Sequence, residues 1–339
     1  MSMSAWEWSF LIFIAMMLLF SVSSNILVVI VMMKNKKLRN VTNTLICNLA
    51  LSDILLGALV LPQNLHDLSH EDDYHEGIFL CKVANACPIW CITCSIYTLV
   101  VISFERKRGI VYSLSKQISI EHCKIIIPSL WIASTLVIMP TIIAFGEVNV
   151  FDENHNKTYT SCGTHLVTHT YSFVNGIFLL LCSYIIPLFI LLFNYFEIIR
   201  FVLKQGKEVK PSENQTNGSL VTSTSVVFKK RIQIVKMLII VAVLFAVSWL
   251  PYFITLIIAK VSGKDASEHA SGPENMMKIF LSAFSTAYNV VLYVIFNANF
   301  RRGLKEILCC RASAPSRSDN QNKDGSVVPS GKIVGNAIR

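Results

Sequence analysis

The chain has 339 residues, of which 53% are apolar and 15% are charged, and its mean hydropathy is +0.54. A water-soluble protein of this composition would lack the polar residues needed to cover its surface, so an ordinary soluble domain is excluded. Buried helices of a soluble protein would also give apolar runs of about 10–14 residues, and the runs here are far longer. The net charge of +9 does not indicate a nucleic-acid partner, because most of it lies between apolar runs, where it faces anionic lipid.

Seven apolar runs follow one another along the chain, and each is long enough to cross a bilayer as a helix, which takes about 20 residues. None shows two-residue alternation in short segments, so the sequence predicts an all-α seven-transmembrane bundle rather than a membrane β-barrel. The sequence also lacks the internal repeats and paired interrupted helices that are typical of transporters. The predicted spans are 8–33, 40–64 (interrupted by Asp53), 83–104, 125–146, 170–196, 237–259 and 279–300.

Basic residues are divided unequally between alternate connections of these runs. By the positive-inside rule, the side that is rich in Lys and Arg is cytoplasmic, which places the amino terminus outside and the carboxyl terminus in the cytoplasm of a multi-pass membrane protein. The first run is too long and ends too late for a cleaved signal peptide, so we expect it to be retained. Five of the 30 basic residues lie on the outer side: Lys82, Lys157, Lys260, Lys264 and Lys278.

This orientation gives a domain organisation. We predict an extracellular amino terminus at 1–7 and a membrane domain at 8–300, with a disordered loop at 205–228. An amphipathic helix at 301–311 and a cytoplasmic tail at 312–339 complete the chain.

Two of the ten cysteines, Cys81 and Cys162, fall on the predicted outer side. That side is oxidising, so the two can form a disulfide that tethers the outer loop before the fifth span, and two free thiols are the alternative. Cys87, Cys91 and Cys94 share one predicted helix. Their spacing is compatible with a metal site, but small-residue packing between helices is the far commoner use of such residues.

Asp53 is the only acid in the interior of a predicted span. A carboxylate inside the membrane is costly unless it faces a cation or a polar cavity. Asn25, Ser95, Ser285 and Asn289 lie at matching depth in other predicted spans. Together with Asp53 they can coordinate a sodium ion or share a proton, and a carboxylate hydrogen-bonded merely for packing is the alternative.

The sixth span carries Trp249 two residues before Pro251, and this proline removes a backbone hydrogen bond and predicts a hinge. Past the seventh span, apolar residues lie on one helical face and basic residues on the other, which predicts an amphipathic helix in contact with membrane lipid. The apolar residues are Phe300, Leu304, Ile307 and Leu308, and the basic ones are Arg301, Arg302 and Lys305.

Three residues are candidates for modification. Cys309 and Cys310 follow the amphipathic helix and are candidates for palmitoylation, with free thiols as the alternative. Asn156 heads a sequon in a predicted outer loop and is therefore a candidate for glycosylation.

These features in this order resemble a class A (rhodopsin-like) G-protein-coupled receptor over about residues 10–310. The resemblance implies a receptor, not an enzyme, that relays an extracellular signal to heterotrimeric G proteins, with arrestin and receptor kinases as further partners. It implies no cofactor beyond an allosteric sodium ion at Asp53, and it assigns the G-protein switch to Glu105, Arg106, Tyr195 and Tyr293. The matching residues are Asn25, Leu49-Ala50-x-x-Asp53, Cys81 with Cys162, Glu105-Arg106, Trp131, Pro187 with Tyr195, Trp249-x-Pro251, Asn289 with Tyr293, and Phe300-Arg301.

The chain departs from the family pattern near the predicted cytoplasmic side. The family's Asp-Arg-Tyr is Glu105-Arg106-Lys107 here, and Asn289 is followed by valine where the family has proline. Many members carry an acid at the inner end of the sixth span that holds the arginine, but this chain has a basic cluster there (Lys229, Lys230 and Arg231). That lock cannot form, and we hypothesise raised activity without ligand.

The resemblance implies a ligand pocket between the third, fifth, sixth and seventh spans. Pro88 stands where amine receptors have an aspartate, and Ala283 stands where opsins have the lysine that binds retinal, so neither ligand class fits. We predict a lining of Gln63, Asn64, Pro88, Ile89, Ile92, Leu179, Ser183, Tyr252, Phe253, Leu256, Ile279 and Ser282.

The first outer loop is acidic, which favours a basic or amidated peptide as the ligand, and a merely solvated loop is the alternative. The runner-up function is a receptor for a small molecule (a nucleoside, a lipid or an atypical amine). The rival from another class is a transporter or channel. The acids of this loop are Asp67, Glu71, Asp72, Asp73 and Glu76.

Overall fold

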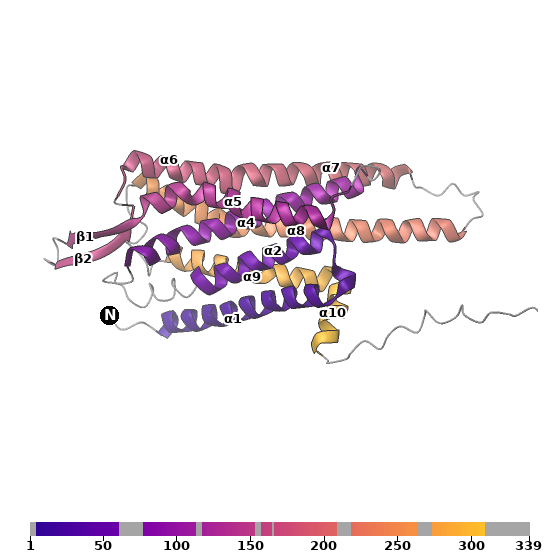
Figure 1. Cartoon of the computed structure of the whole chain (residues 1–339), viewed down its shortest axis with the longest axis horizontal. Coiled ribbons are helices and arrows are strands. Elements are labelled where there is room, and N and C mark those ends of the chain that lie inside the picture. Colours follow the sequence, from indigo (N-terminus) through magenta and orange to yellow (C-terminus); the bar gives the residue numbers. More distant parts are fainter. Residues whose placement is uncertain are drawn as a thin grey trace, which may run out of the picture.

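The computed structural model describes residues 5–60, 77–112, 117–152, 157–164, 166–208, 218–262 and 273–308. Within these ranges long helices run side by side as a bundle, with a β-hairpin at one end and a short helix that turns away from the bundle at the other (Figure 1). We call these the hairpin end and the α10 end. The all-α membrane fold predicted from the sequence is confirmed.

The helices in chain order give the membrane domain its seven spans. Seven stretches of the described residues are long and apolar enough to cross a membrane, and α6 and α7 together make one of them. The elements are α1 (Ala5–Lys34), a 3₁₀ turn (Lys36–Leu38), α2 (Val41–Leu55) with a π-helical turn (Leu56–Val60), α4 (Gly77–Ile110), α5 (Ile120–Ala144), α6 (His169–Leu180) joined by a π-helical turn (Leu181–Ile185) to α7 (Ile186–Glu208), α8 (Gly218–Ser262), α9 (Pro273–Phe296) and α10 (Ala298–Leu308).

Several helices extend beyond the boundaries predicted from the sequence. α1 begins at Ala5, inside the predicted tail, and α10 begins at Ala298, three residues before the predicted start at 301. The prediction of disorder at 205–228 was wrong for residues 205–208 and 218–228, which are helical, whereas 209–217 lie outside the described residues. Hydropathy identifies only the apolar part of a helix. The helix can continue into polar residues, because adding a hydrogen-bonded residue to an existing helix costs little free energy.

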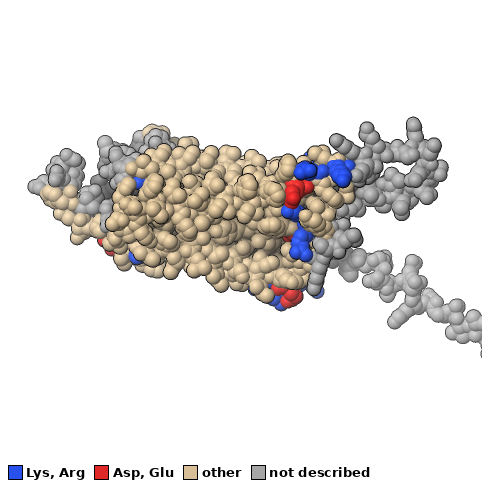
Figure 2. Space-filling view, turned by 90° about the horizontal axis from the view of Figure 1, so that it is seen from above, with Lys and Arg blue, Asp and Glu red and all other residues tan. Residues whose placement is uncertain are grey.

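The surface of the bundle is apolar and its interior holds many polar side chains. Ile125 and Phe189 are 71% and 70% exposed, whereas Asn48 and Ser103 are buried. Figure 2 shows a face whose middle carries no charged residue, with Lys, Arg, Asp and Glu confined to its ends. This arrangement suits helices whose outer surface contacts hydrocarbon and whose polar groups bond to one another.

The hairpin consists of β1 (Gly146–Asp152) and β2 (Lys157–Gly163), which pair antiparallel from Gly146↔Gly163 to Asp152↔Lys157. It projects past the ends of the helices (Figure 1). The sequence reasoning missed it, because alternation was sought in the apolar runs alone. The signal was present, since Val148 and Val150 alternate with polar residues and favour strands.

Candidate functional site

A disulfide joins the hairpin to the helix bundle. Cys81 in the second turn of α4 is bonded to Cys162 of β2, with their Cα atoms 5.7 Å apart. The side-chain amide of Asn85, one turn further along α4, donates to the Cys162 sulfur at 3.4 Å. The disulfide prediction is therefore confirmed, and the alternative of two free thiols is wrong. The hairpin is fixed over the end of the bundle at which the ligand pocket was predicted.

Part of the predicted pocket lining comes together on α4, α6 and α8. Ile89 and Leu179 are buried in one cluster, and Tyr252 and Leu256 pack against it. Ser183, in the π-helical turn between α6 and α7, accepts a hydrogen bond from the Thr93 hydroxyl at 2.8 Å. These contacts tie the third, fifth and sixth spans together below the hairpin.

The remaining lining residues fall into different places. Ile92 and Phe253 belong to the main core, Pro88 is half-buried in α4, and Ser282 is buried in α9. Ile279 is buried in a separate cluster with Ile14 of α1 and Ala283 of α9, and its place in the pocket stays a prediction. Gln63 and Asn64 lie outside the described residues.

An aromatic group continues from these residues into the bundle. Trp249 is buried, 6.0 Å from the ring of Tyr252 and 6.4 Å from that of Phe245. The Tyr184 hydroxyl donates to the carbonyl oxygen of Ala246 at 2.7 Å. Pro251 lies beside this group, and α8 remains one continuous helix through it. The predicted hinge therefore has aromatic packing on the pocket side and a hydrogen bond from the fifth span.

Asp53 lies at the centre of a small polar cavity in the middle of the bundle. Its carboxylate is 5% exposed and accepts a hydrogen bond from the Asn289 side chain at 2.9 Å. The cavity has a volume of about 10 Å³, roughly that needed for one water-sized species. It is lined by Leu49, Asp53, Leu56, Ile92, Ser95, Leu99, Phe245, Trp249, Ser285, Tyr288 and Asn289.

The donor set around Asp53 suits a hard monovalent cation. One carboxylate, two hydroxyls and an amide oxygen face a single cavity, and the Asn289 Oδ1 has no hydrogen-bond partner among the described atoms. Asn25 does not line this cavity: its side-chain nitrogen donates to the backbone oxygens of Ser21 and Thr286, and its Oδ1 is buried without a partner among the described atoms. Depth in the membrane alone did not show which way Asn25 faces around its helix.

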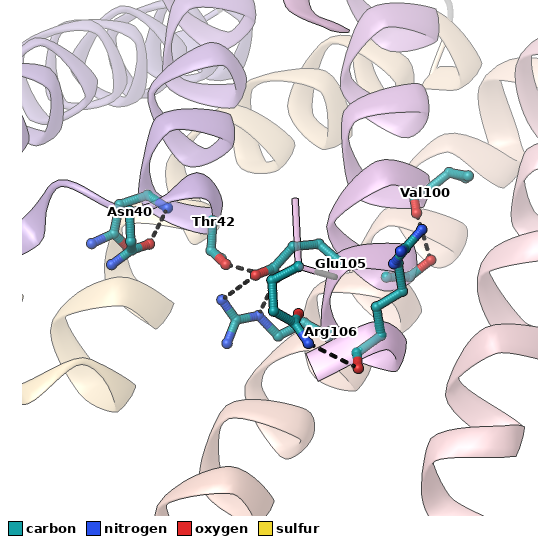
Figure 3. Close-up of polar contacts among 9 residues, drawn as sticks. Asn40, Thr42, Val100, Glu105 and Arg106 are labelled. Atoms are coloured by element: carbon teal, nitrogen blue, oxygen red, sulfur yellow. Dashed lines mark hydrogen bonds and ion pairs between the residues drawn. The ribbon is translucent and has the colours of Figure 1, made fainter. Parts of the chain in front are cut away.

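The predicted G-protein switch lies at the α10 end of α4. Glu105 forms an ion pair with Arg106, with Nε and Oε2 2.7 Å apart, and accepts a hydrogen bond from Thr42 of α2 at 2.9 Å. Figure 3 shows Glu105 between Thr42 and Arg106. The arginine is thus held by an acid on its own helix, and that acid is held by α2. The Thr42 contact was not foreseen from the sequence.

The two tyrosines assigned to the switch are buried in the same half of the bundle. Tyr195 of α7 is 3% exposed and Tyr293 of α9 is 2% exposed. The hydroxyl of Tyr195 has no hydrogen-bond partner among the described residues. The structure therefore contains the four switch residues with Arg106 engaged by Glu105 and the Tyr195 hydroxyl available.

A second polar network on α4 was missed altogether. Lys107 forms an ion pair with Glu197 of α7 and donates to Asn194 Oδ1 at 3.3 Å. Asn194 in turn donates to Ser103 at 2.9 Å, and Ser103 donates to the carbonyl oxygen of Val100 at 2.6 Å. Val100 marks the end of this chain of contacts in Figure 3. The lysine in place of the family's tyrosine was the sequence signal, but its partner lies 90 residues further along the chain.

Among the described residues, the cysteines inside the bundle are not arranged as a metal site. The sulfur atoms of Cys87 and Cys91 are 3.9 Å apart, while Cys94 accepts a contact from Asn48 on α2. Across the described ranges no three His, Cys, Asp or Glu side chains come together in a way that could hold a metal ion. The packing interpretation of these cysteines is the one that the structure supports.

The short helix α10 packs against α1 and caps the last span. Phe300 is 1% exposed, and the Arg301 side chain donates to the carbonyl oxygens of Val294 and Ile295 at the end of α9. Free carbonyls at a helix end need such partners. The modification candidates Asn156, Cys309 and Cys310 lie outside the described residues, as do the side chains of the basic cluster of the sixth span.

Comparison with known proteins agrees with this arrangement. The family model described as "7 transmembrane receptor (rhodopsin family)" matches residues 24–293. A QRFP-like peptide receptor of Branchiostoma floridae is 29% identical, over 90% of this chain and 79% of the relative. The histamine H2 receptor of Homo sapiens is 26% identical (88% and 79%), and neuropeptide FF receptor 1 of Rattus norvegicus is 26% identical (83% and 66%). The chain belongs to the rhodopsin family of seven-transmembrane receptors.

Proposed function

We propose that this protein, a receptor and not an enzyme, binds an extracellular peptide at the hairpin end and activates heterotrimeric G proteins at the α10 end. The observation that carries the proposal is the position of the Glu105–Arg106 pair at the far end of the bundle from the disulfide-tethered hairpin. A signal that arrives at one end has to move helices before it reaches Arg106 at the other.

The orientation follows from charge. Most of the basic residues lie in the connections at the α10 end, which the positive-inside rule assigns to the cytoplasm. The amino terminus and the hairpin then face the outside of the plasma membrane. Arrestin and receptor kinases would act on the same cytoplasmic face, and α10 would lie against membrane lipid.

A peptide ligand is favoured by the chemistry of the predicted pocket and by the hairpin. The predicted lining contains no charged residue, and Pro88 cannot supply the aspartate that an amine would pair with. In the described part of the chain the hairpin is a two-stranded sheet, and the edge of a sheet is a structure with which an extended peptide can pair. Two of the relatives are named as receptors for peptides.

The mechanism would depend on two arrangements of the helices. In one, Arg106 remains paired with Glu105; in the other, α8 swings about Pro251, and Arg106 is released toward a G protein. A ligand that binds the second arrangement more tightly shifts the population toward it. A sodium ion held by Asp53, Ser95, Ser285 and Asn289 would neutralise the buried carboxylate and stabilise the arrangement that has this cavity.

A small amine is the second candidate ligand, because one of the relatives is named as a histamine receptor. The two candidates differ in what they need from the pocket. A small amine has to form an ion pair with an acid between the helices, whereas a peptide can also bind to the hairpin and the outer loops.

The test is nucleotide exchange on a panel of purified G proteins by the full-length receptor, with a library of basic and amidated peptides and a library of amines that includes histamine. We expect activation by a peptide and none by amines. The Arg106→Ala variant should abolish it at equal surface expression, whereas Arg39→Ala, at an exposed basic residue at the same end, should not. Activation by amines alone would overturn the peptide assignment. Failure of every ligand and of every G protein would overturn the function.

A further inference from the structure

The second network on α4 connects the third and fifth spans at the α10 end. Lys107 reaches α7 through two contacts, the ion pair with Glu197 and the hydrogen bond to Asn194. Its ammonium group also lies 5.5 Å from the centre of the Phe193 ring. On α7, Asn194 follows Phe193 directly, and Glu197 lies one helical turn further on. One face of α7 therefore presents a ring, an amide and an acid to one cation.

The burial of this network makes it stronger than an ordinary surface pair. The side chains of Lys107 and Glu197 are 14% and 34% exposed, and Asn194 is 1% exposed. Partial removal from water strengthens the attraction between opposite charges, and the amide and the aromatic ring compensate part of the lost hydration of the ammonium group. By contrast, the Glu121–Lys124 pair on α5 is 74% and 72% exposed and spans a single helical turn.

The Lys107 network and the Glu105–Arg106 pair lie in the same two turns of α4 but contact different neighbouring helices. Thr42 of α2 holds Glu105 on one side, and Asn194 and Glu197 of α7 hold Lys107 on the other. Tyr195, the switch residue of α7, lies next to Asn194 in sequence. Its hydroxyl has no partner among the described residues while Arg106 is engaged by Glu105. A contact that fixes α7 in this position therefore coexists with the engaged form of the arginine.

We propose that Lys107 is a positioning residue: its pair with Glu197 holds α7 against α4 in the arrangement that keeps Arg106 on Glu105. The pair takes the place of the lock between the third and sixth spans, which the basic cluster of this chain does not allow. The inference rests on the proposed G-protein function and adds a means of restraining it. Lys107 itself acts through α7 and not on the G protein.

The test measures nucleotide exchange without ligand, in membranes matched for receptor surface expression. Lys107→Met and Glu197→Gln should each raise the exchange rate about fivefold over the wild type, the upper end of the effect of losing an exposed ion pair, because this pair is partly buried. The charge swap Lys107→Glu with Glu197→Lys should return it toward the wild-type rate. Lys124→Met and Glu121→Gln remove the same charges at the same end of the bundle and should leave the rate unchanged.

The two residues lie on different helices, so an equal effect of either single variant, reversed by the swap, points to the pair and not to direct contact with the G protein. Unchanged exchange in Lys107→Met and Glu197→Gln, with measurable exchange by the wild type, would overturn the proposal. So would a swap that fails to reverse the effect of the single variants while reaching the surface normally.

A second measurement does not depend on G proteins. The melting temperatures of the purified wild type, Lys107→Met, Glu197→Gln and the variant that carries both of these substitutions form a double-mutant cycle in detergent, in which additive losses mean that the two side chains are not coupled. Additive losses in melting temperature would contradict the proposed coupling of Lys107 and Glu197 even if the variants change signalling. Absence of exchange by every receptor, the wild type included, overturns the G-protein function instead, and the cycle then still shows whether the pair exists.

Discussion

Single buried polar side chains hold neighbouring spans in register. Asn48 of α2 accepts a hydrogen bond from the Trp131 ring nitrogen of α5 at 2.9 Å and donates to Thr98 of α4 at 2.8 Å. One amide thus joins three helices. Because Asn48 is buried inside the bundle, water cannot readily replace a lost partner.

Trp131→Phe removes the donor of the α5 contact and keeps most of the ring. We expect it to destabilise the receptor by about 0.6–1.7 kcal/mol, the range for hydrogen bonds between membrane helices. Thermal unfolding in detergent measures this as a lower melting temperature. Ser129→Ala is the matched control, because Ser129 lies on the same helix, is exposed and bonds only to the backbone oxygen of Ile125 among the described contacts. An equal loss in both variants would contradict the role of the Asn48 bond.

Asp53→Asn tests the sodium site at the same scale. The amide has nearly the same shape but no negative charge, so a cation bound there would lose its main attraction. We expect the wild-type melting temperature to rise with NaCl relative to N-methylglucamine chloride at equal ionic strength. The variant should show no such difference. Sodium stabilisation that survives in Asp53→Asn would place any sodium effect elsewhere in the protein.

At the scale of helices, close approach depends on small residues. A Cβ atom on Gly57 would lie 2.8 Å from Val22 Cγ2 of α1, which is closer than carbon atoms normally pack. Gly109 in α4 is different, because a Cβ there would meet its nearest neighbour at 3.7 Å. Packing of membrane helices commonly uses such small residues at the contact.

Gly57→Ala should therefore force α1 and the second span apart at a cost of about 1–3 kcal/mol, the usual range for overpacking. Gly109→Ala should be neutral or slightly stabilising, because alanine is the better helix former. Melting temperatures of the two variants distinguish the effects. A Gly57→Ala receptor as stable as Gly109→Ala would show that Val22 can move aside without loss.

The sequence was sufficient to predict the membrane spans and the disulfide, because these depend on run length, hydropathy and the side of the membrane. Length and hydropathy located all seven spans, and the oxidising side selected Cys81 and Cys162 from ten cysteines. Side-chain direction was harder to predict: depth alone grouped Asn25 with Asp53, but Asn25 does not line the Asp53 cavity, because rotation about a helix axis is set by packing. The Lys107–Glu197 pair was invisible for a related reason, since it needs the relative positions of α4 and α7.

For the molecule as a whole, the prediction is its orientation in the membrane. An epitope tag before Met1 should be reached by antibody on intact cells expressing the full-length receptor, and a tag after Arg339 should be reached only after permeabilisation. The cause is the excess of Lys and Arg at the α10 end. Staining of the carboxyl-terminal tag on intact cells would reverse the orientation and, with it, the assignment of the two functional ends.

The hypothesis of raised basal activity stays a prediction, which ligand-free exchange above that of mock-transfected membranes would support.

The sixth span also has a mechanical consequence. α8 is 45 residues long and extends past its neighbours at the α10 end (Figure 1). From Pro251 back to Gly218 the helix measures about 50 Å at 1.5 Å per residue. As a rigid lever pivoting at Pro251, it would carry its tip about 9 Å for a tilt of about 10°. A change too small to disturb the packing around Trp249 would therefore arrive at the far tip as a displacement nearly as wide as a helix.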